Sequence, residues 1–184
     1  MEDSKNLKCC FTGYRPNKFP FSVYDTENAL YRQFENSVIE EILKLCHNGC
    51  RTFYTGMAMG FDIIAAEIVL LIKNSYNTPI ELVCVVPFKN QGDSFSPFWK
   101  NKYTKIIENS DSVICLNEEY HKGCYQQRNK YMVENSDYIL TWYDGKSGGT
   151  RNTIDYAAKI GRYIINANRE ETEIFAIQTT FEII

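Results

Sequence analysis

The sequence predicts a single α/β domain in which helices cover both faces of a mostly parallel sheet. Two observations predict this fold. Short apolar runs alternate with helical patterns along nearly all of the 184 residues, which is typical of repeated strand–helix–strand units. The apolar runs are almost continuous, as expected for strands that are covered on both faces.

The elements of the first third follow from simple stop and start signals. Residues 7–12 are an apolar run that ends at Gly13, and they predict the first strand. After a loop with two prolines, we expect a helix from Asp25 or Thr26, because apolar residues recur on one face at helical spacing. Asn48-Gly49 is a usual helix end. Residues 52–55 predict the second strand.

The middle of the chain continues the alternation. A second helix is expected from Asp62, a good N-cap residue, and its body is apolar nearly all round, which predicts a buried helix. Residues 80–86 predict the third strand. Ser96-Pro97 places a capping residue before a proline in the first helical position, so we expect a third helix that runs to about Glu108.

The last third predicts three strands with two helices between them. Strands are expected at residues 113–116, 138–142 and 163–166, and helices at roughly 123–135 and from Arg151 to Ile160. No linker is visible, so we expect one domain over residues 1–184. Its core would span about 7–166, with a C-terminal extension at 167–184. The apolar residues 173–184 fit an edge strand and a subunit contact equally well.

Composition narrows the functional class. The formal net charge is −3, which argues against nucleic acid as a partner, because non-specific binding to phosphate backbones needs a positive surplus. The seven cysteines form no C-x-x-C pair, and most lie in apolar runs expected to be buried, so we expect free thiols and no metal site. Neither a signal peptide nor a membrane span is visible. We expect a cytoplasmic protein.

Polar residues and glycines follow five of the predicted strands. In open parallel sheets, ligands bind outside the carboxyl ends of the strands, where the strand order reverses. The sequence therefore predicts one ligand-binding crevice. We expect it to be lined by Thr12, Gly13 and Arg15, by Gly56, Met57, Gly60 and Asp62, by Gln91 and Trp99, by Arg128 and Asn129, and by Ser147, Gly148, Gly149 and Thr150.

This residue set suits a phosphate-bearing ligand. Glycines allow close approach of the backbone, and helix N-termini after Gly60 and Gly149 present N–H groups and a positive dipole end to an anion. Arg15 and Arg128 suit phosphate oxygens, and Trp99 suits stacking on a base. Simpler interpretations remain open: Thr150 and Asp62 as plain helix caps, and Trp99 as a core residue.

Common nucleotide-binding motifs are missing. The sequence has no G-x-G-x-x-G after the first strand and no G-K-[ST], which argues against a standard NAD dehydrogenase and a P-loop NTPase. The two histidines are not spaced as a catalytic pair.

Five segments in this order carry a family resemblance: "TGYRP" (12–16), "GMAMGFDIIAAE" (56–67), "VPF…Q…W" (86–99), "YQQRNKYM" (125–132) and "SGGTRNTIDYA" (147–157). They resemble the YpsA-like family of the SMF/DprA–LOG (SLOG) superfamily. The resemblance implies a Rossmann-like domain with a pocket for a nucleotide or a nucleotide-derived ligand.

Two other branches of the superfamily have activities with which this sequence can be compared. The LOG branch removes the base from nucleoside 5′-monophosphates, and the resemblance places Arg128 and Met132 on its arginine helix. Thr153 stands where that branch has a glutamate, and the nearest carboxylate on the helix is Asp155. The DprA branch binds single-stranded DNA, but the sequence shows no basic stripe with interleaved aromatics.

We therefore expect a binding protein, with a sensor or regulatory role, for a nucleotide, ADP-ribose-like or NAD-like ligand, and we expect a homodimer. No further cofactor is expected. One alternative is a nucleotide N-glycosidase that uses Arg128 with Asp62 or Asp144, since glycosidic cleavage needs a carboxylate near the ribose. A second alternative is a module that binds single-stranded nucleic acid or another protein.

Overall fold

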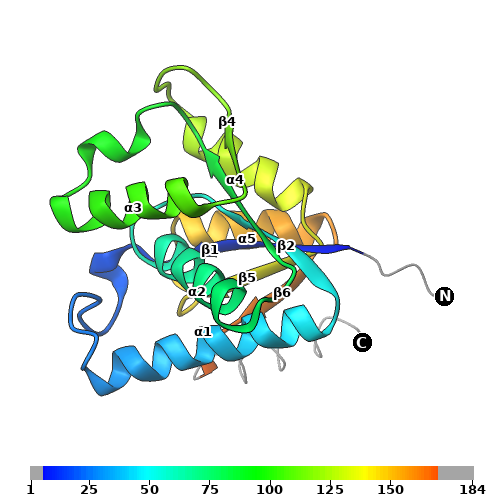
Figure 1. Ribbon diagram of the computed structural model, residues 1–184. Helices are drawn as coiled ribbons and strands as arrows, with labels where there is room; N and C mark the ends of the chain where they lie inside the picture. The colour runs from blue at the N-terminus through cyan, green and yellow to red at the C-terminus, as the bar shows by residue number, and fades with distance from the viewer. Residues whose placement is uncertain (1–5, 170–184) are drawn as a thin grey trace.

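The computed structural model describes residues 6–169, and they form a three-layer α/β domain (Figure 1). One six-stranded sheet has the order β4-β3-β2-β1-β5-β6, and every neighbouring pair is parallel. The α/β class and the parallel sheet are thus confirmed. The strands are β1 (Leu7–Gly13), β2 (Cys50–Thr55), β3 (Glu81–Val86), β4 (Ser112–Cys115), β5 (Tyr138–Trp142) and β6 (Tyr163–Asn166).

Helices cover both faces of the sheet. Contacts link α1 to α2 and α2 to α3 on one face, and α4 to α5 on the other. The α-helices are α1 (Ala29–His47), α2 (Phe61–Tyr76), α3 (Pro97–Asn109), α4 (Cys124–Glu134) and α5 (Gly149–Lys159), with short 3-10 helices η1 (Pro16–Lys18) and η2 (Gln91–Ser94).

Each face of the sheet has its own apolar core. The larger core includes Phe11, Phe53 and Phe61 beneath α1 to α3, and the smaller one includes Cys10, Val85 and Met132 beneath α4 and α5. Helix α2 is buried along most of its length, as its all-round apolar sequence predicts. Removal of this apolar surface from water is the main favourable term that holds the three layers together.

Three helices begin elsewhere than expected. Helix α1 starts at Ala29, because the Asn28 side chain accepts hydrogen bonds from the N–H groups of Leu30 and Tyr31 and so caps the first turn. Gly60 is the N-cap of α2 and Gly148 is the N-cap of α5. Asp62 and Thr150 are therefore not helix caps, and each side chain makes other contacts.

The strand order reverses at β1. This strand pairs with β2 on one side and with β5 on the other, and Gly13 at its end lies opposite Trp142 at the end of β5. The loops after β1 and β5 leave this point toward opposite faces of the sheet, which is where an open parallel sheet forms a crevice.

All seven cysteines are free thiols in the structure. Cys115 is exposed, against the expectation of a buried strand, because β4 is an edge strand whose residues are mostly exposed. Within residues 6–169 there is no group of side chains that could hold a metal ion. No helix in this part of the chain is long and apolar enough to cross a membrane. Residues 173–184, expected to form an edge strand or a subunit contact, lie outside the described residues.

Candidate functional site: a basic crevice at the ends of strands β1 and β5

A cavity of about 680 Å³ opens at the carboxyl ends of β1 and β5. The loop after β1, the first turn of α2, helix α4, and the loop from β5 into α5 together line it. We call it the crevice. Most of the residues expected at a ligand site meet here: Thr12, Gly13, Arg15, Asp62, Arg128, Asn129, Ser147, Gly148, Gly149 and Thr150, together with Asp144.

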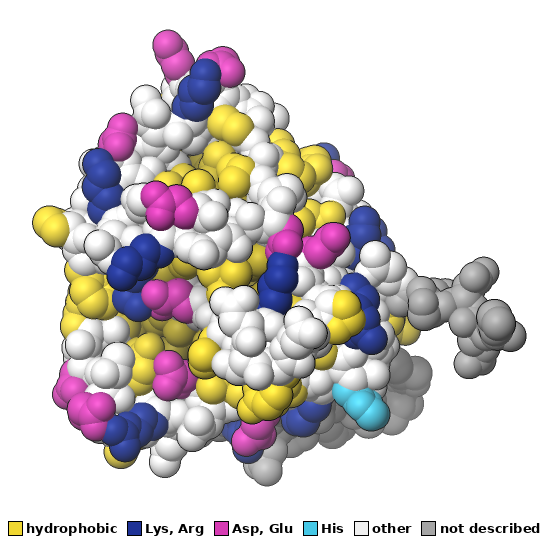
Figure 2. All heavy atoms as spheres, viewed as in Figure 1, with side chains coloured by type: hydrophobic (Ala, Val, Ile, Leu, Met, Phe, Trp, Pro, Cys, Tyr) yellow, Lys and Arg dark blue, Asp and Glu magenta, His cyan; other side chains and the backbone are white. Residues whose placement is uncertain are grey.

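The crevice is positively charged although the chain is acidic. Its lining contains five basic side chains and two acidic ones, a formal charge of +3, while the whole chain carries −3. The basic residues are Arg15, Lys18, Arg128, Lys130 and Lys146, and the acidic ones are Asp62 and Asp144. On the face of the molecule shown in Figure 2, by contrast, basic and acidic side chains are interspersed. The negative net charge of the chain therefore does not exclude a local positive potential that attracts anions.

Arg128 is the most buried cation of the crevice, with 3% of its surface exposed. Its guanidinium donates to the carbonyl oxygen of Gly56 and, at 2.8 Å, to Oδ1 of Asn129. Within residues 6–169, no carboxylate pairs with it at ion-pair distance. Burial lowers the pKa of Arg128, and the nearby charge of Arg15 lowers it further, while Asp62 raises it. An anion bound in the crevice would offset the electrostatic cost of burying the Arg128 charge close to Arg15.

Asp62 lies at the base of the crevice and is 5% exposed. Burial raises the pKa of its carboxyl group, and the charges of Arg128 and Arg15 and two backbone N–H groups only partly counter this. Asp62 is thus a buried carboxyl group that interacts electrostatically with Arg128 and Arg15 without reaching ion-pair distance of either.

Gly56 leaves room for the Arg128 guanidinium. A Cβ atom at this position would lie 2.2 Å from Nη1 of Arg128, so the guanidinium would have to shift. The same carbonyl of Gly56 accepts a second hydrogen bond from Nε2 of Gln91 at 3.2 Å. The loop after β2 therefore supports Arg128 from behind, and of its residues Ala58 lines the crevice.

A chain of hydrogen bonds connects Arg128 to the start of α5. Nε of Arg128 donates to Oδ1 of Asn129, Nδ2 of Asn129 donates to the Thr153 hydroxyl at 2.9 Å, and that hydroxyl donates to the carbonyl of Gly149 at 2.9 Å. Thr153 is 5% exposed. The Thr153 hydroxyl, which the family resemblance matched to a glutamate of the LOG branch, is thus engaged in structural hydrogen bonds.

The first turn of α5 faces the crevice. No side chain caps it, so the N–H groups of the first turn have no partner within the helix. The Thr150 hydroxyl donates to the carbonyl of Gly13 at 3.0 Å and joins this turn to the end of β1. Gly148 has a φ of 152°, which favours glycine, and a Cβ atom at Gly149 would meet nothing within 4 Å. Free N–H groups beside open space are the usual elements of a phosphate site.

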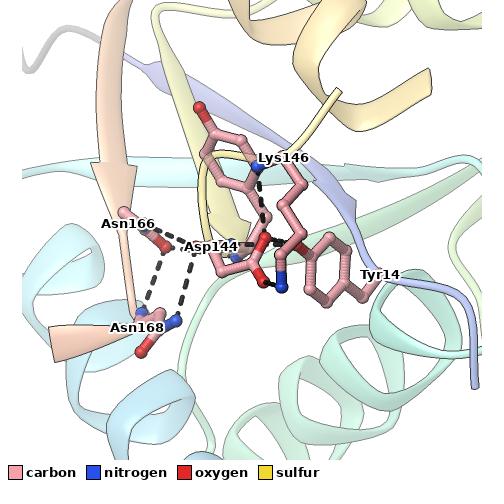
Figure 3. A network of polar contacts seen from close by, with 6 residues as sticks. Tyr14, Asp144, Lys146, Asn166 and Asn168 are labelled. Carbon is pink, nitrogen blue, oxygen red and sulfur yellow. Dashed lines mark hydrogen bonds and ion pairs between the residues drawn. The ribbon is translucent and has the colours of Figure 1, made fainter. Parts of the chain in front are cut away.

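A polar network holds the loop after β5 in place (Figure 3). The Asn166 side chain accepts from the N–H of Tyr143 at 3.4 Å and donates to its carbonyl at 3.1 Å. The Tyr14 hydroxyl donates to the Asp144 carboxylate, which also pairs with Lys146 at 2.5 Å. Partial burial raises the pKa of Asp144, but the hydrogen bonds from Lys146 outweigh it and lower the pKa below its ordinary value.

Five residues expected at the site do not line the crevice. Trp99 is 1% exposed and donates to the Tyr24 hydroxyl at 3.0 Å, so it is a core residue that offers no face to a base. Gln91 is equally buried and donates to the carbonyls of Gly56 and Met57. Gly56, Met57 and Gly60 shape the loop behind Arg128. These three glycine and methionine residues lie in the loop that leads into the buried helix α2, so they support the site without facing it.

The crevice also contains residues that the sequence did not single out: Tyr14, Asn17, Lys18, Ala58, Tyr125, Gln126, Lys130, Lys146, Asn152 and Tyr156. Several lie one helical turn from a predicted residue. Tyr125, for example, lies three residues before Arg128, and the guanidinium carbon of Arg128 is 5.9 Å from the centre of its ring. Helical spacing from Arg128 was the signal that could have indicated Tyr125.

The comparison with protein families agrees with this geometry. The model of the YpsA family, described as the YspA SLOG family, matches residues 9–179. The chain belongs to this family. The prophage-derived protein YoqJ of Bacillus subtilis is 33% identical over 135 residues, covering 67% of this chain and 77% of that protein. A UPF0398 protein of Halalkalibacterium halodurans is 27% identical over 141 residues, covering 76% and 73%.

Solved structures of DNA processing protein A share the fold of this SLOG protein. The protein from Helicobacter pylori, whose structure is described in terms of its single-stranded DNA binding mode, has a TM-score of 0.62 at 19% identity, covering 91% of this chain and 72% of that one. The protein from Streptococcus pneumoniae has a TM-score of 0.59 at 18% identity, covering 89% and 50%.

This structural likeness corrects one expectation. The acidic composition argued against nucleic acid as a partner, yet the chain shares its fold with a protein that binds single-stranded DNA. The exclusion was wrong because it rested on net charge. The crevice is basic although the net charge of the chain is negative. A phosphate group responds to the electrostatic potential at its binding site and not to the net charge of the whole protein.

Proposed function

We propose that the crevice of this SLOG protein binds the phosphate of a nucleotide or nucleotide-derived ligand, and that the protein acts as a sensor or regulator. One observation carries the proposal: Arg128 is buried on the crevice without a carboxylate at ion-pair distance among the described residues. Arg15, exposed at the rim, forms no ion pair within the same residues. Two such cations beside the uncapped turn of α5 suit a phosphate dianion.

Thermal unfolding in the presence of ligands tests this proposal. The panel contains inorganic phosphate, ribose 5-phosphate, nucleoside mono- and diphosphates, ADP-ribose and NAD. A ligand at one hundred times its dissociation constant stabilises the folded state by about 2.7 kcal/mol. We expect at least one phosphate ester to raise the melting temperature, and its nucleoside without phosphate to have a much smaller effect. If no member of the panel shifts the melting temperature, the proposal is wrong.

The substitution Arg15→Gln tests whether the phosphate ester binds in the crevice. Arg15 is exposed, so the change removes a charge without leaving a buried cavity. We expect the affinity for the phosphate ester to fall, since charge-assisted hydrogen bonds are about twice as strong as neutral ones. Lys105→Gln is the matched control, because Lys105 is an exposed residue of α3 outside the crevice. Equal effects of the two changes would mean that the ligand binds elsewhere.

A second candidate function is the binding of single-stranded DNA. It is favoured by the fold shared with the Helicobacter pylori protein and by an aromatic cluster beside the crevice. Phe88, Tyr120 and Tyr125 lie with ring centres 5.6 to 6.2 Å apart, Tyr120 is 64% exposed, and Tyr125 reaches the crevice. Exposed aromatic rings next to a basic groove suit stacked bases.

Fluorescence anisotropy with a labelled oligothymidylate distinguishes this candidate from the first. Binding should weaken steeply as salt increases, because phosphate contacts release counterions. Tyr120→Ala should weaken the binding of the oligonucleotide and leave the affinity for a mononucleotide unchanged. An oligonucleotide that fails to bind at low salt excludes this candidate without affecting the first.

A further inference from the structure

A second cavity, of about 810 Å³, adjoins the crevice. Both cavities are lined by Tyr14, Lys18, Asp144 and Lys146, so these four residues form the partition between them. Figure 3 shows three of the four, with the Tyr14 hydroxyl directed at the Asp144 carboxylate. The crevice and the second cavity therefore lie on either side of one shared wall.

The second cavity differs from the crevice in chemistry. Part of its wall is aromatic: Phe21, Phe34 and Trp142 lie with ring centres 5.5 to 5.8 Å apart. Phe21 is only partly buried, and Leu30 at the mouth is 49% exposed. Such an apolar surface suits the flat ring of a ligand, because stacking removes the faces of the ring from water.

Both neutral and charged polar groups line the second cavity. The exposed amides of Gln33 and Asn36 border it. Glu40 and Arg169, which also line it, pair with each other. An aromatic wall with amide groups at its edge matches a nucleobase, whose faces are apolar and whose edges carry donors and acceptors. The cations on this cavity are Lys18 and Lys146, which it shares with the crevice, and Arg169, which is paired with Glu40.

Tyr14 belongs to both cavities. Its ring packs edge-on against Trp142, with centres 5.8 Å apart, and its hydroxyl meets Asp144 at the crevice. We propose that the aromatic cavity is the base-binding subsite for the nucleotide whose phosphate occupies the crevice. This inference rests on the proposed function, and it adds where the base lies and which residues hold it. The ligand class is thus a nucleotide with its base attached, bound across Tyr14.

Phe21→Ala tests the subsite. The probes are adenosine 5′-monophosphate and ribose 5-phosphate, which share the phosphate and sugar and differ in the base. Stacking of one base on an aromatic side chain changes affinity by about five- to one-hundred-fold. We expect the variant to bind adenosine 5′-monophosphate about tenfold more weakly and ribose 5-phosphate as well as the unchanged protein does. Phe98→Ala, at a 41% exposed aromatic residue that lines neither cavity, is the matched control.

Trp142 supplies a direct readout. The chain has two tryptophans, so Trp99→Phe leaves Trp142, which lines the aromatic cavity, as the single emitter. Adenosine 5′-monophosphate should change the emission of Trp142 on binding, because the base stacks near its ring. Ribose 5-phosphate should bind without that change.

The outcomes separate the two proposals. If ribose 5-phosphate and adenosine 5′-monophosphate both bind, but Phe21→Ala weakens them equally and Trp142 responds to neither, the base subsite is wrong and the phosphate site stands. If neither probe nor any other phosphate ester binds, the proposed function fails and the subsite fails with it. Both the phosphate site and the base subsite are supported if adenosine 5′-monophosphate binds more tightly than ribose 5-phosphate, if Phe21→Ala reduces this difference, and if the emission of Trp142 responds to the base.

Discussion

The Tyr14 hydroxyl and Asp144 form a reciprocal contact: the hydroxyl donates to the Asp144 carboxylate and accepts from the Asp144 backbone N–H at 3.0 Å. The two residues lie 130 positions apart in the chain. Their contact joins the loops that follow β1 and β5, and it does so at the wall between the two cavities. The Tyr14 hydroxyl thus helps to hold both loops at the wall that the two cavities share.

Tyr14→Phe should lower the free energy of unfolding by about 1–2 kcal/mol, because a hydrogen bond to a charged group is lost while the 8% exposed ring stays in place. Urea unfolding followed by circular dichroism measures the difference. Tyr76→Phe, at a 71% exposed tyrosine, should leave stability unchanged. An equally stable Tyr14→Phe variant would show that the contact contributes little to the fold.

The Asp144 carboxylate should make stability depend on acidity. Its pKa is lowered in the folded state, so its contribution is present above the pKa of an unfolded aspartate, about 3.9, and is lost as the pH falls through the folded value. Asp144→Asn should therefore cost about 1 kcal/mol at neutral pH, and the cost should disappear in strong acid. Unfolding curves at several pH values measure this, with exposed Glu119→Gln as control. A cost that is independent of pH would indicate lost packing, not lost charge.

Gly56→Ala should disturb Arg128. The added Cβ atom would lie 2.2 Å from Nη1 of Arg128, and overpacking of a buried position costs roughly 1–3 kcal/mol. We expect lower stability and weaker binding of a phosphate ester. Gly149→Ala is the matched control for stability, since its Cβ atom would meet nothing within 4 Å. Equal stability of the two variants would mean that the guanidinium can move aside without cost.

Cleavage of nucleotides is not expected. The family resemblance places Thr153 where the LOG branch has a carboxylate, and Asp155 on the same helix pairs with Arg151 at 2.7 Å and does not line the crevice. Incubation with nucleoside 5′-monophosphates and with NAD, followed by chromatography, should yield no free base above the rate without protein. Base release would instead assign a hydrolase, and the double change Asp62→Asn and Asp144→Asn should then abolish it if either carboxylate takes part.

Sequence periodicity alone determined the parallel sheet, the helices on both faces and the segments that end at the crevice. These features depend on the local spacing of apolar residues and on stop signals such as Gly13 and Gly161, so they can be recognised without tertiary contacts. The glycine loop at 148–149 and the arginine helix were recognised for the same reason, because each is a short contiguous motif.

Only the tertiary structure decided which of these residues face a ligand. Trp99 and Gln91 follow β3 as expected, but the packing of α3 and of the loop after β2 buries them. Lys18 and Lys146 join the crevice from loops about 130 residues apart, and the positive field that they help to create is invisible in a net charge of −3. Burial and local charge depend on which distant segments meet, and a sequence read in order does not contain that information.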